Sequence, residues 1–350
     1  MKIRWSAVIP TLNRVKTLVG TLDCLARQTL PPSIFEVLVV DNGSIDGTKE
    51  AVLSFIKEHP AHNIRYIRDE TIGLLAGRHR GAQEARADIL TFFDDDVEFA
   101  NDFAVHILKA FLDGQVVLVG GPSRPRFEAE PPEWLEHYIT REGGRMVCTH
   151  LSLLDLGNKA KDIAPEYVWG LNFSIRKQTL FEAEGFHPDL VPQHLQMYQG
   201  DGETGLSYKI KELGLKTRYV PEAAVVHIIP GSRLTEEYFH KRNFYQGVCD
   251  SYTEIRKKSG PAHLSLPLPV PVPSDGNAVY ARIHNAYVEG YRFHQEAVLS
   301  SPKLLEWVLR PDYWDYAYPE LEEGLAFSRP SALESAKIPL EGLRQDKTRT

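Results

Sequence analysis

Through the first 120 residues, short apolar runs rich in β-branched residues alternate with stretches that have the periodicity of amphipathic helices. The segment after Asn13, for example, places Val15, Leu18 and Leu22 on one apolar face. Strands are expected at 5–9, 36–40, 64–67, 89–93 and 116–119, with helices between them. Because parallel strands need crossover connections, which are usually helices, this alternation predicts an α/β fold with a mostly parallel sheet flanked by helices.

The strand expected at 89–93 leads directly into three consecutive carboxylates, Asp94, Asp95 and Asp96. Functional groups in open α/β sheets gather at the carboxyl ends of strands. On an extended segment alternate side chains share a face, so Asp94 and Asp96 are expected to project together while Asp95 points away. Two hard oxygen ligands on one face suit Mg²⁺ or Mn²⁺, which can neutralise a diphosphate. A solvated acidic turn is the alternative interpretation.

Composition narrows the class of protein. The chain has 350 residues and a net charge of −7, and this acidic balance argues against general nucleic-acid binding. Three widely separated cysteines without zinc-ligand spacing favour a reduced, cytoplasmic protein. The N-terminus runs into a strand without a signal-peptide pattern, and no apolar run reaches the roughly 20 residues of a membrane-spanning helix. Peripheral association with a membrane stays open.

Beyond residue 120 the pattern is less regular. Residues 120–165 are expected to form substrate-facing loops and small helices, followed by a strand at 167–175 and a helix over 177–184. Residues 201–214 are expected to form a loop that leads into an amphipathic helix, and a long helix is expected over 236–257. Residues 261–273 are dominated by Pro, Leu and Val and predict an extended strap. Two further helices are expected at 277–299 and 303–309. The aromatic cluster that follows, expected to pack on the rest of the chain or to form a homodimer contact, comprises Tyr313, Trp314, Tyr316 and Tyr318.

Four ordered motifs occur between Ser6 and Gly247. They are Val-Ile-Pro-Thr-Leu-Asn-Arg at 8–14, Val-Val-Asp-Asn-Gly-Ser-Ile-Asp-Gly-Thr at 39–48, Gly-Leu-Leu-Ala-Gly-Arg-His-Arg-Gly-Ala at 73–82, and Gly-Glu-Thr-Gly-Leu at 202–206. Each is degenerate alone, but together with the aspartates their order and spacing resemble the family 2 glycosyltransferases. The resemblance implies a GT-A domain over 1–258. Composition and pattern predict that a Pro-rich linker at 259–276, a C-terminal helical region at 277–327 and a flexible tail at 328–350 follow this domain.

The resemblance implies a nucleotide-diphosphate sugar as donor, with UDP the commonest nucleotide in the family. Asp41 would accept a hydrogen bond from the base, which suits an acceptor-only carboxylate. A plain Asx turn is the alternative for Asp41, and a surface helix charge is the alternative for Arg78. The implied nucleotide-binding residues are Pro10, Thr11, Asn13, Asp41, Arg78, Asp94 and Asp95.

The resemblance also implies Mn²⁺ or Mg²⁺ held by Asp96, Asp94 and His227, which would stabilise the leaving nucleoside diphosphate. A lone histidine is more often structural. The base position of the family, usually Asp, is occupied here by Glu203, and Asp201 is the second candidate.

The acceptor wall is predicted at the turn 169–173, with Trp169 and Asn172, since an indole can stack on a sugar ring. Core packing is the alternative for this turn.

The predicted activity is inverting transfer of a sugar to a saccharide, lipid-linked or other hydroxyl acceptor. Two alternatives come from other classes. A nucleotidyltransferase would be expected to have a Gly-rich, basic loop after the first strand, whereas residues 10–14 of this chain contain no glycine and a single Arg. A catalytically degenerate nucleotide-sugar-binding protein would be expected to lack the metal-binding aspartates, whereas Asp94 and Asp96 are both present.

Overall fold

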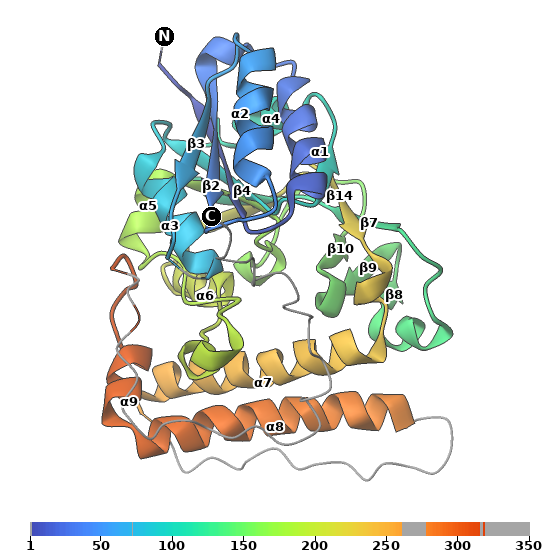
Figure 1. The fold of residues 1–350 in the computed structure, drawn as a ribbon, viewed down its shortest axis with the longest axis vertical. Helices are drawn as coiled ribbons and strands as arrows, with labels where there is room; N and C mark the ends of the chain where they lie inside the picture. Colours follow the sequence, from blue (N-terminus) through green and yellow to red (C-terminus); the bar gives the residue numbers. More distant parts are fainter. Residues whose placement is uncertain (1, 72, 261–277, 316–317, 319–350) are drawn as a thin grey trace, which may run out of the picture. The chain divides into compact units, whose positions relative to one another are not determined.

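The computed structural model describes residues 2–71, 73–260, 278–315 and 318. Its strands form two sheets (Figure 1). The larger sheet has the strand order β11-β13-β6-β12-β4-β1-β2-β3. The bounds of its strands are β1 (Trp5–Thr11), β2 (Phe35–Asp41), β3 (Ile64–Arg68), β4 (Ile89–Phe93), β6 (Val116–Gly120), β11 (Lys161–Asp162), β12 (Asn172–Arg176) and β13 (Lys216–Tyr219).

The centre of this sheet is parallel, as predicted, and is buried on both faces. β1 pairs in parallel with β2 and with β4, whereas β12 runs antiparallel between β4 and β6. One face packs against α1 (Val15–Ala26), α2 (Thr48–Glu58) and α4 (Phe103–Ala110). The other face receives α3 (Leu74–Glu84), whose Gly81 lies directly against Val8 of β1. Helices on both faces explain why β1 and β2 are mostly apolar and are buried along their whole length.

The smaller sheet corrects the expectation for residues 120–165. Its order is β5-β14-β7-β10-β9-β8, so most of that region forms strands and short helical turns. These strands have three to five residues, too few for an alternating pattern to stand out. The bounds of these strands are β5 (Val97–Phe99), β7 (Ser123–Phe127), β8 (Thr140–Glu142), β9 (Arg145–Cys148), β10 (Leu153–Asp155) and β14 (Val225–Ile229). The described part of the chain also has six 3₁₀ turns, at Pro32–Ile34, Glu133–Tyr138, Thr149–Leu151, Pro165–Tyr167, Gln193–Tyr198 and Gly231–Arg233.

The C-terminal part is helical, as predicted. α5 (Lys177–Glu182) and α6 (Glu203–Glu212) precede α7 (Glu236–Lys258), and α8 (Ala278–Ser300) and α9 (Pro302–Val308) follow it. α7 and α8 lie side by side (Figure 1). Two glycines allow this close packing, because a Cβ at Gly247 would lie 2.0 Å from the carbonyl oxygen of Tyr287 and one at Gly290 would lie 1.9 Å from that of Phe244.

Part of the predicted aromatic cluster packs on the rest of the chain. The hydroxyl of Tyr252 donates to that of Tyr313 over 2.7 Å. The ring of Trp314 stacks on those of His79 and Phe181, with centroid distances of 4.0 and 4.1 Å. Tyr316, the Pro-rich stretch at 261–273 and the tail at 328–350 lie outside the described residues. None of the helices in the described part of the chain combines the length and the apolar character needed to span a bilayer.

Candidate active site

The loops after β1 and β2 meet at one edge of the large sheet, because these parallel neighbours end together. The side-chain oxygen of Asn13 accepts from the backbone N–H of Ile45 over 2.8 Å. The backbone N–H of Asn13 donates to the Ser44 hydroxyl over 2.9 Å. Asn13 therefore ties two loops together and does not cap α1. The N–H of Val15 at the start of that helix is satisfied by Asp46, at 3.0 Å.

Asp41 lies in the same pair of loops and is fully buried. Its carboxylate accepts from the N–H of Ser44 at 2.8 Å and from the hydroxyl of Tyr66 at 2.6 Å. Burial works against the ionised form, but these hydrogen bonds together with the charge of Arg68 hold the pKa of Asp41 below its ordinary value. Asp41 thus forms the local turn and remains an ionised acceptor beside the loops predicted to bind the nucleotide.

The three consecutive aspartates have different surroundings. Asp95 turns back toward β1, where Thr11 Oγ1 donates to it over 2.6 Å and Arg14 pairs with it at 2.9 Å. Burial raises the pKa of Asp95 to about 7, although these two groups oppose the shift. Asp94 lines a cavity, and burial and the neighbouring Asp96 raise its pKa.

Asp96 lies beside His227 because β14 pairs with β5 directly after the aspartates. Arg14 and Arg233 both donate to Oδ2 of Asp96, with Arg233 at 3.0 Å. Burial disfavours the Asp96 carboxylate, yet the neighbouring His227, Arg233 and Arg14 lower its pKa well below the ordinary range. Asp96 is therefore ionised although it is buried.

The residues around Asp96 have donor chemistry that fits a divalent cation. Oδ1 of Asp96 is buried and has no hydrogen-bond partner among the described residues, and His227 Nε2 lies 3.5 Å from it. His227 Nδ1 faces the carbonyl oxygen of Leu151 at 2.9 Å, a contact that leaves the Nε2 lone pair available, as in metal-binding histidines. Nε2 at present accepts from Arg233 at 2.8 Å. The described residues contain no ready-made group of three metal-binding side chains.

A cavity of about 280 Å³ lies between Asp94 and α7. Glu203, at the first position of α6, projects into it and is held at both carboxylate oxygens. The N–H of Gly170 donates to Oε1 over 2.8 Å, and Arg78 donates to Oε2 over 3.0 Å. A Cβ at Gly170 would lie 1.9 Å from Arg78 Nη2, so only glycine leaves room for this guanidinium.

The wall of the cavity is formed by Leu74, Arg78, Asp94, Leu151, Ser152, Gly170, Leu171, Asp189, Leu190, Glu203, His227, Arg233, Tyr238, Lys241, Arg242 and Tyr245. Motif residues far apart in the sequence thus meet at one hollow. Asp201 does not line it.

Asp201 instead joins two elements of the fold. Its carboxylate pairs with His187 Nδ1 at 2.6 Å and accepts from the hydroxyl of Thr253 on α7 at 2.6 Å. Burial raises the energy of the charged form, but the charge and hydrogen bond of His187 lower the pKa of Asp201 below its ordinary value. All these partners belong to the protein, so Asp201 connects the start of α6 to α7.

The acceptor role predicted for Trp169 and Asn172 is not supported by their positions. Trp169 packs against the main core and donates from its indole N–H to the carbonyl oxygen of Glu166 at 3.0 Å. Asn172 begins β12 and is buried, with its amide donating to Ala223 at 2.9 Å. The cavity is lined instead by the two residues between them, Gly170 and Leu171. Core packing, the alternative interpretation of this turn, describes both side chains.

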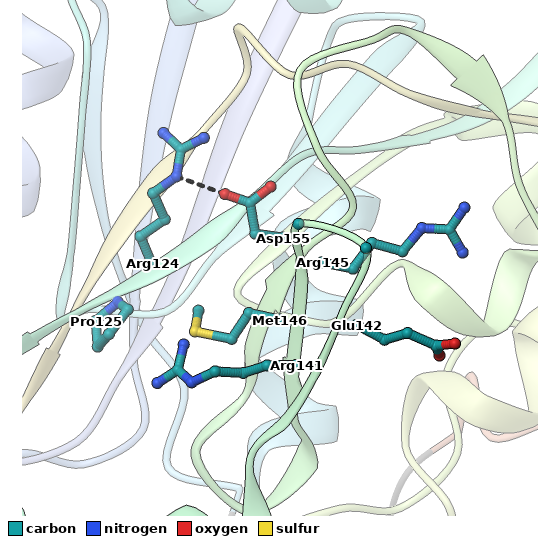
Figure 2. A pocket seen from close by; sticks show the side chains of 9 residues that line it. Arg124, Pro125, Arg141, Glu142, Arg145, Met146 and Asp155 are labelled. Carbon is teal, nitrogen blue, oxygen red and sulfur yellow. Dashed lines mark hydrogen bonds and ion pairs between the residues drawn. The ribbon is translucent and has the colours of Figure 1, made fainter.

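A larger hollow on the small sheet has different chemistry (Figure 2). Its volume is about 510 Å³, and Arg124, Arg141 and Arg145 line it together with Glu142 and Asp155. Arg124 is paired with Asp155 at 2.8 Å, and none of the motif residues lines this hollow. The candidate active site is therefore the smaller cavity beside Asp94.

Comparison with known proteins identifies the chain. Residues 6–178 match the family model described as glycosyl transferase family 2. This part of the chain belongs to glycosyl transferase family 2. This assignment confirms the resemblance seen in the four motifs and decides against a nucleotidyltransferase.

Two relatives illustrate the match. Glycosyltransferase AglE of Haloferax volcanii is 36% identical over 116 residues, which are 33% of this chain and 38% of that protein. Validoxylamine A glucosyltransferase of Streptomyces hygroscopicus subsp. limoneus is 39% identical over 107 residues, which are 30% of this chain and 23% of that protein. The glycosyltransferase thus aligns with less than two-fifths of the length of either relative.

A solved structure supports the fold. The mannosyltransferase PcManGT from Pyrobaculum calidifontis, in complex with GDP-Man and Mn²⁺, superposes with a TM-score of 0.53 at 16% identity, covering 90% of this chain and 86% of that one. At this identity the likeness concerns the fold alone. It confirms that the glycosyltransferase has the predicted GT-A architecture.

Several cavity residues were not predicted from the sequence. Asp189 follows an irregular His-Pro stretch and carries no pattern that marks it. Arg233 follows His227 closely, so the position of that histidine could have drawn attention to it. The four cavity residues of α7 recur at helical spacing in its N-terminal turns, a signal that could have been found: Tyr238, Lys241, Arg242 and Tyr245.

Proposed function

We propose that the glycosyltransferase moves a sugar from a nucleoside-diphosphate sugar to an acceptor hydroxyl with inversion, and that a divalent cation assists the reaction. The observation that carries the proposal is that one cavity joins Asp94, His227 and Glu203. Asp94 and His227 lie on the side of Asp96, where the diphosphate would leave, and Glu203 reaches the cavity from α6. UDP is the first nucleotide to test, since it is the commonest in the family.

Glu203 is the base in this proposal, because it is the carboxylate of the 202–206 motif that lines the cavity. Each of its oxygens accepts one hydrogen bond from the protein, which leaves each with a further lone pair for the acceptor hydroxyl. Holding the carboxylate at two points fixes its direction before the acceptor arrives, as general-base catalysis requires. Glu203 would take the proton from the hydroxyl as its oxygen attacks the sugar carbon.

Asp96, Asp94 and His227 would hold Mn²⁺ or Mg²⁺, and a bound cation would supply positive charge to the leaving diphosphate. The buried, unpartnered Oδ1 of Asp96 supports this set. Arg14 and Arg233 add fixed positive charge on the same side. A cytoplasmic location belongs to the same proposal and is supported by the three free cysteines, Cys24, Cys148 and Cys249.

Titration with UDP, GDP and a panel of their sugars, with and without Mn²⁺, tests the proposal. Wild-type protein is expected to bind at least one nucleotide in a Mn²⁺-dependent way. Asp96→Asn should remove most of this dependence, because a neutral amide is a poorer ligand for a hard cation. The control is Asp102→Asn, which changes an exposed carboxylate just before α4. Failure of every nucleotide to bind would refute the function, whereas an unchanged Mn²⁺ effect in Asp96→Asn would refute the metal site.

Asp41→Ala is expected to weaken binding of the nucleotide by about 1.5–3 kcal/mol, the usual value of a hydrogen bond to a charged group. Turnover at saturating donor should change less. Tyr66→Phe is the matched control, since it removes a partner of Asp41 but keeps the carboxylate. Calorimetric titration of both variants measures the effect. A lower thermal stability with unchanged affinity in Asp41→Ala would leave Asp41 as a turn residue alone.

A further inference from the structure

One face of α7 presents two cations and two tyrosines to the cavity. Tyr238, Lys241, Arg242 and Tyr245 are spaced so that they follow one stripe of the helix, and all four line the cavity. The buried residues of α7 include Phe239 and, in later turns of the helix, Val248, Tyr252 and Ile255. The polar stripe is therefore confined to the N-terminal turns of α7, where it lines the cavity.

The two cations of this stripe have no ion-paired carboxylate among the described residues, unlike the other arginines of the cavity. Arg78 is paired with Glu203 at 3.0 Å and Arg233 with Asp96 at 3.0 Å. Lys241 and Arg242 make no hydrogen bond or ion pair within the described part of the chain. Lys241 is exposed, with Nζ 5.6 Å from the ring centre of Tyr245, and Arg242 is half-buried. A half-buried guanidinium without a hydrogen-bonded partner has unused donors.

Arg242 lies on the side of the cavity that holds Glu203. Burial disfavours its charge, yet Tyr238, Asp189 and Glu203 are near enough to raise the pKa of Arg242 above its ordinary value. On the other side, Arg14 and Arg233 already supply positive charge next to Asp96. The cations of α7 are thus additional to those at the predicted diphosphate site and lie where the acceptor would approach the base.

We propose that Lys241 and Arg242 form a subsite for an anionic group, a phosphate or a carboxylate, carried by the acceptor. Arginine and lysine donors match the oxygens of both groups, and a planar guanidinium can contact two of them at once. Tyr238 and Tyr245 flank the cations and present aromatic surface on which a sugar ring packs. This inference rests on the proposed function and specifies its acceptor as a negatively charged saccharide.

The subsite is tested with sugars that differ in charge. Ligand-observed NMR compares the neutral forms of glucose, galactose and mannose with their 6-phosphates and uronic acids, at saturating Mn²⁺ and UDP. At least one charged sugar should bind about tenfold or more tightly than its neutral form. Arg242→Met is expected to weaken that binding by about 10- to 100-fold, the range for a hydrogen bond between charged groups. Lys241→Met should weaken it less, because Lys241 is exposed.

Three controls make the result specific. Arg145→Met removes a cation that lines the other hollow (Figure 2) and should leave binding of the charged sugar unchanged. Arg242→Lys keeps the charge and should retain much of the affinity. Thermal unfolding of each variant checks that the fold is intact, and Lys241→Met at the exposed position tests the subsite even if Arg242→Met unfolds.

The outcomes separate this inference from the proposed function. If Arg242→Met weakens binding of UDP and Mn²⁺ as much as binding of the charged sugar, the cations serve the donor and the acceptor subsite is refuted. If no charged sugar binds wild-type protein more tightly than its neutral form, the subsite is also refuted, while nucleotide binding still supports the function. A preference for the phosphates or for the uronic acids identifies which anion the acceptor carries.

Discussion

Replacing Glu203 with Gln is expected to lower turnover by roughly 10²–10⁴-fold with donor affinity nearly intact, which is the usual contribution of a general base. Gln has nearly the same shape, so the change removes the proton acceptor and keeps the volume. One local effect follows from the geometry. The amide can accept from Gly170 or from Arg78 through its single oxygen but not from both, so a small loss of thermal stability should accompany the kinetic loss.

Asp201→Asn is the control for Glu203→Gln, because Asp201 is the other candidate for the catalytic base. Asp201 pairs with His187 and Thr253 and does not line the cavity, so this substitution should reduce stability by about 1–3 kcal/mol through lost buried hydrogen bonds. Turnover of the folded fraction should change little. A large kinetic loss at full stability in Asp201→Asn, with an active Glu203→Gln, would make Asp201 the base.

Asp189→Asn completes the series, because Asp189 is another carboxylate of the same cavity. Its Oδ1 accepts from the N–H of Leu190 and from the amide of Gln199, both at 2.8 Å. It is therefore held by its own loop, and its loss should affect acceptor KM more than kcat. Turnover and thermal stability measured for Glu203→Gln, Asp201→Asn and Asp189→Asn therefore identify which of the three carboxylates is the base.

The parts of the fold that were predictable are those whose signals are local. The bounds of β1, β2, β3, β4 and β6 agree with the expected ranges to within two residues, since each is a mostly apolar run that ends at a turn. The long helix α7 was predicted within one residue because charged and apolar residues keep a helical period along it. The cluster after β4 was predictable for the same reason, since an apolar run that ends in carboxylates is visible in the sequence alone.

The parts that were missed depend on contacts between distant residues. The strand β5 was not predicted, because its three residues carry no pattern of their own; His227 was expected beside Asp96 from the family resemblance, and the pairing of β14 with β5 is what brings the two together. The partners of Asp201 lie 14 and 52 residues away, so its carboxylate could not be separated from Glu203 by sequence position. Likewise, Trp169 resembles a sugar-stacking residue in sequence, whereas its contact with the main core depends on residues that are distant in the chain.

Acidification is expected to destabilise the protein strongly through three histidines, of which His79 and His294 are buried and His150 is half-buried. Burial lowers the pKa of His79 to about 3, that of His294 to about 3 and that of His150 to about 4. The surroundings of His79 show why protonation is disfavoured. Its Nδ1 faces the carbonyl oxygen of Tyr313 and its Nε2 accepts from the N–H of Phe186, so a second ring proton would point at another donor.

The sign of the effect follows from proton linkage. Below the ordinary histidine pKa of about 6.5 the unfolded chain binds a proton at each site and the folded protein does not, so stability falls as the pH falls from about 6.5 toward 4. Each histidine is expected to cost about 2 kcal/mol at pH 5 relative to neutral pH. The three together approach the total stability of an ordinary protein, about 5–15 kcal/mol. Asp95, whose pKa is raised to about 7, acts in the opposite direction over the same range.

Variants isolate the histidine contribution from that of Asp95. His294 is the best position, since its Nδ1 meets the Ser251 hydroxyl at 2.8 Å and its Nε2 has no hydrogen-bond partner in the described part of the chain. In His294→Gln the free energy of unfolding, measured by urea titration from pH 4.5 to 7, should decline with acid less steeply by about 1.4 kcal/mol per pH unit. His137→Gln, which changes an exposed histidine, should keep the wild-type slope. An unchanged slope in His294→Gln would show that burial of this ring does not control acid stability.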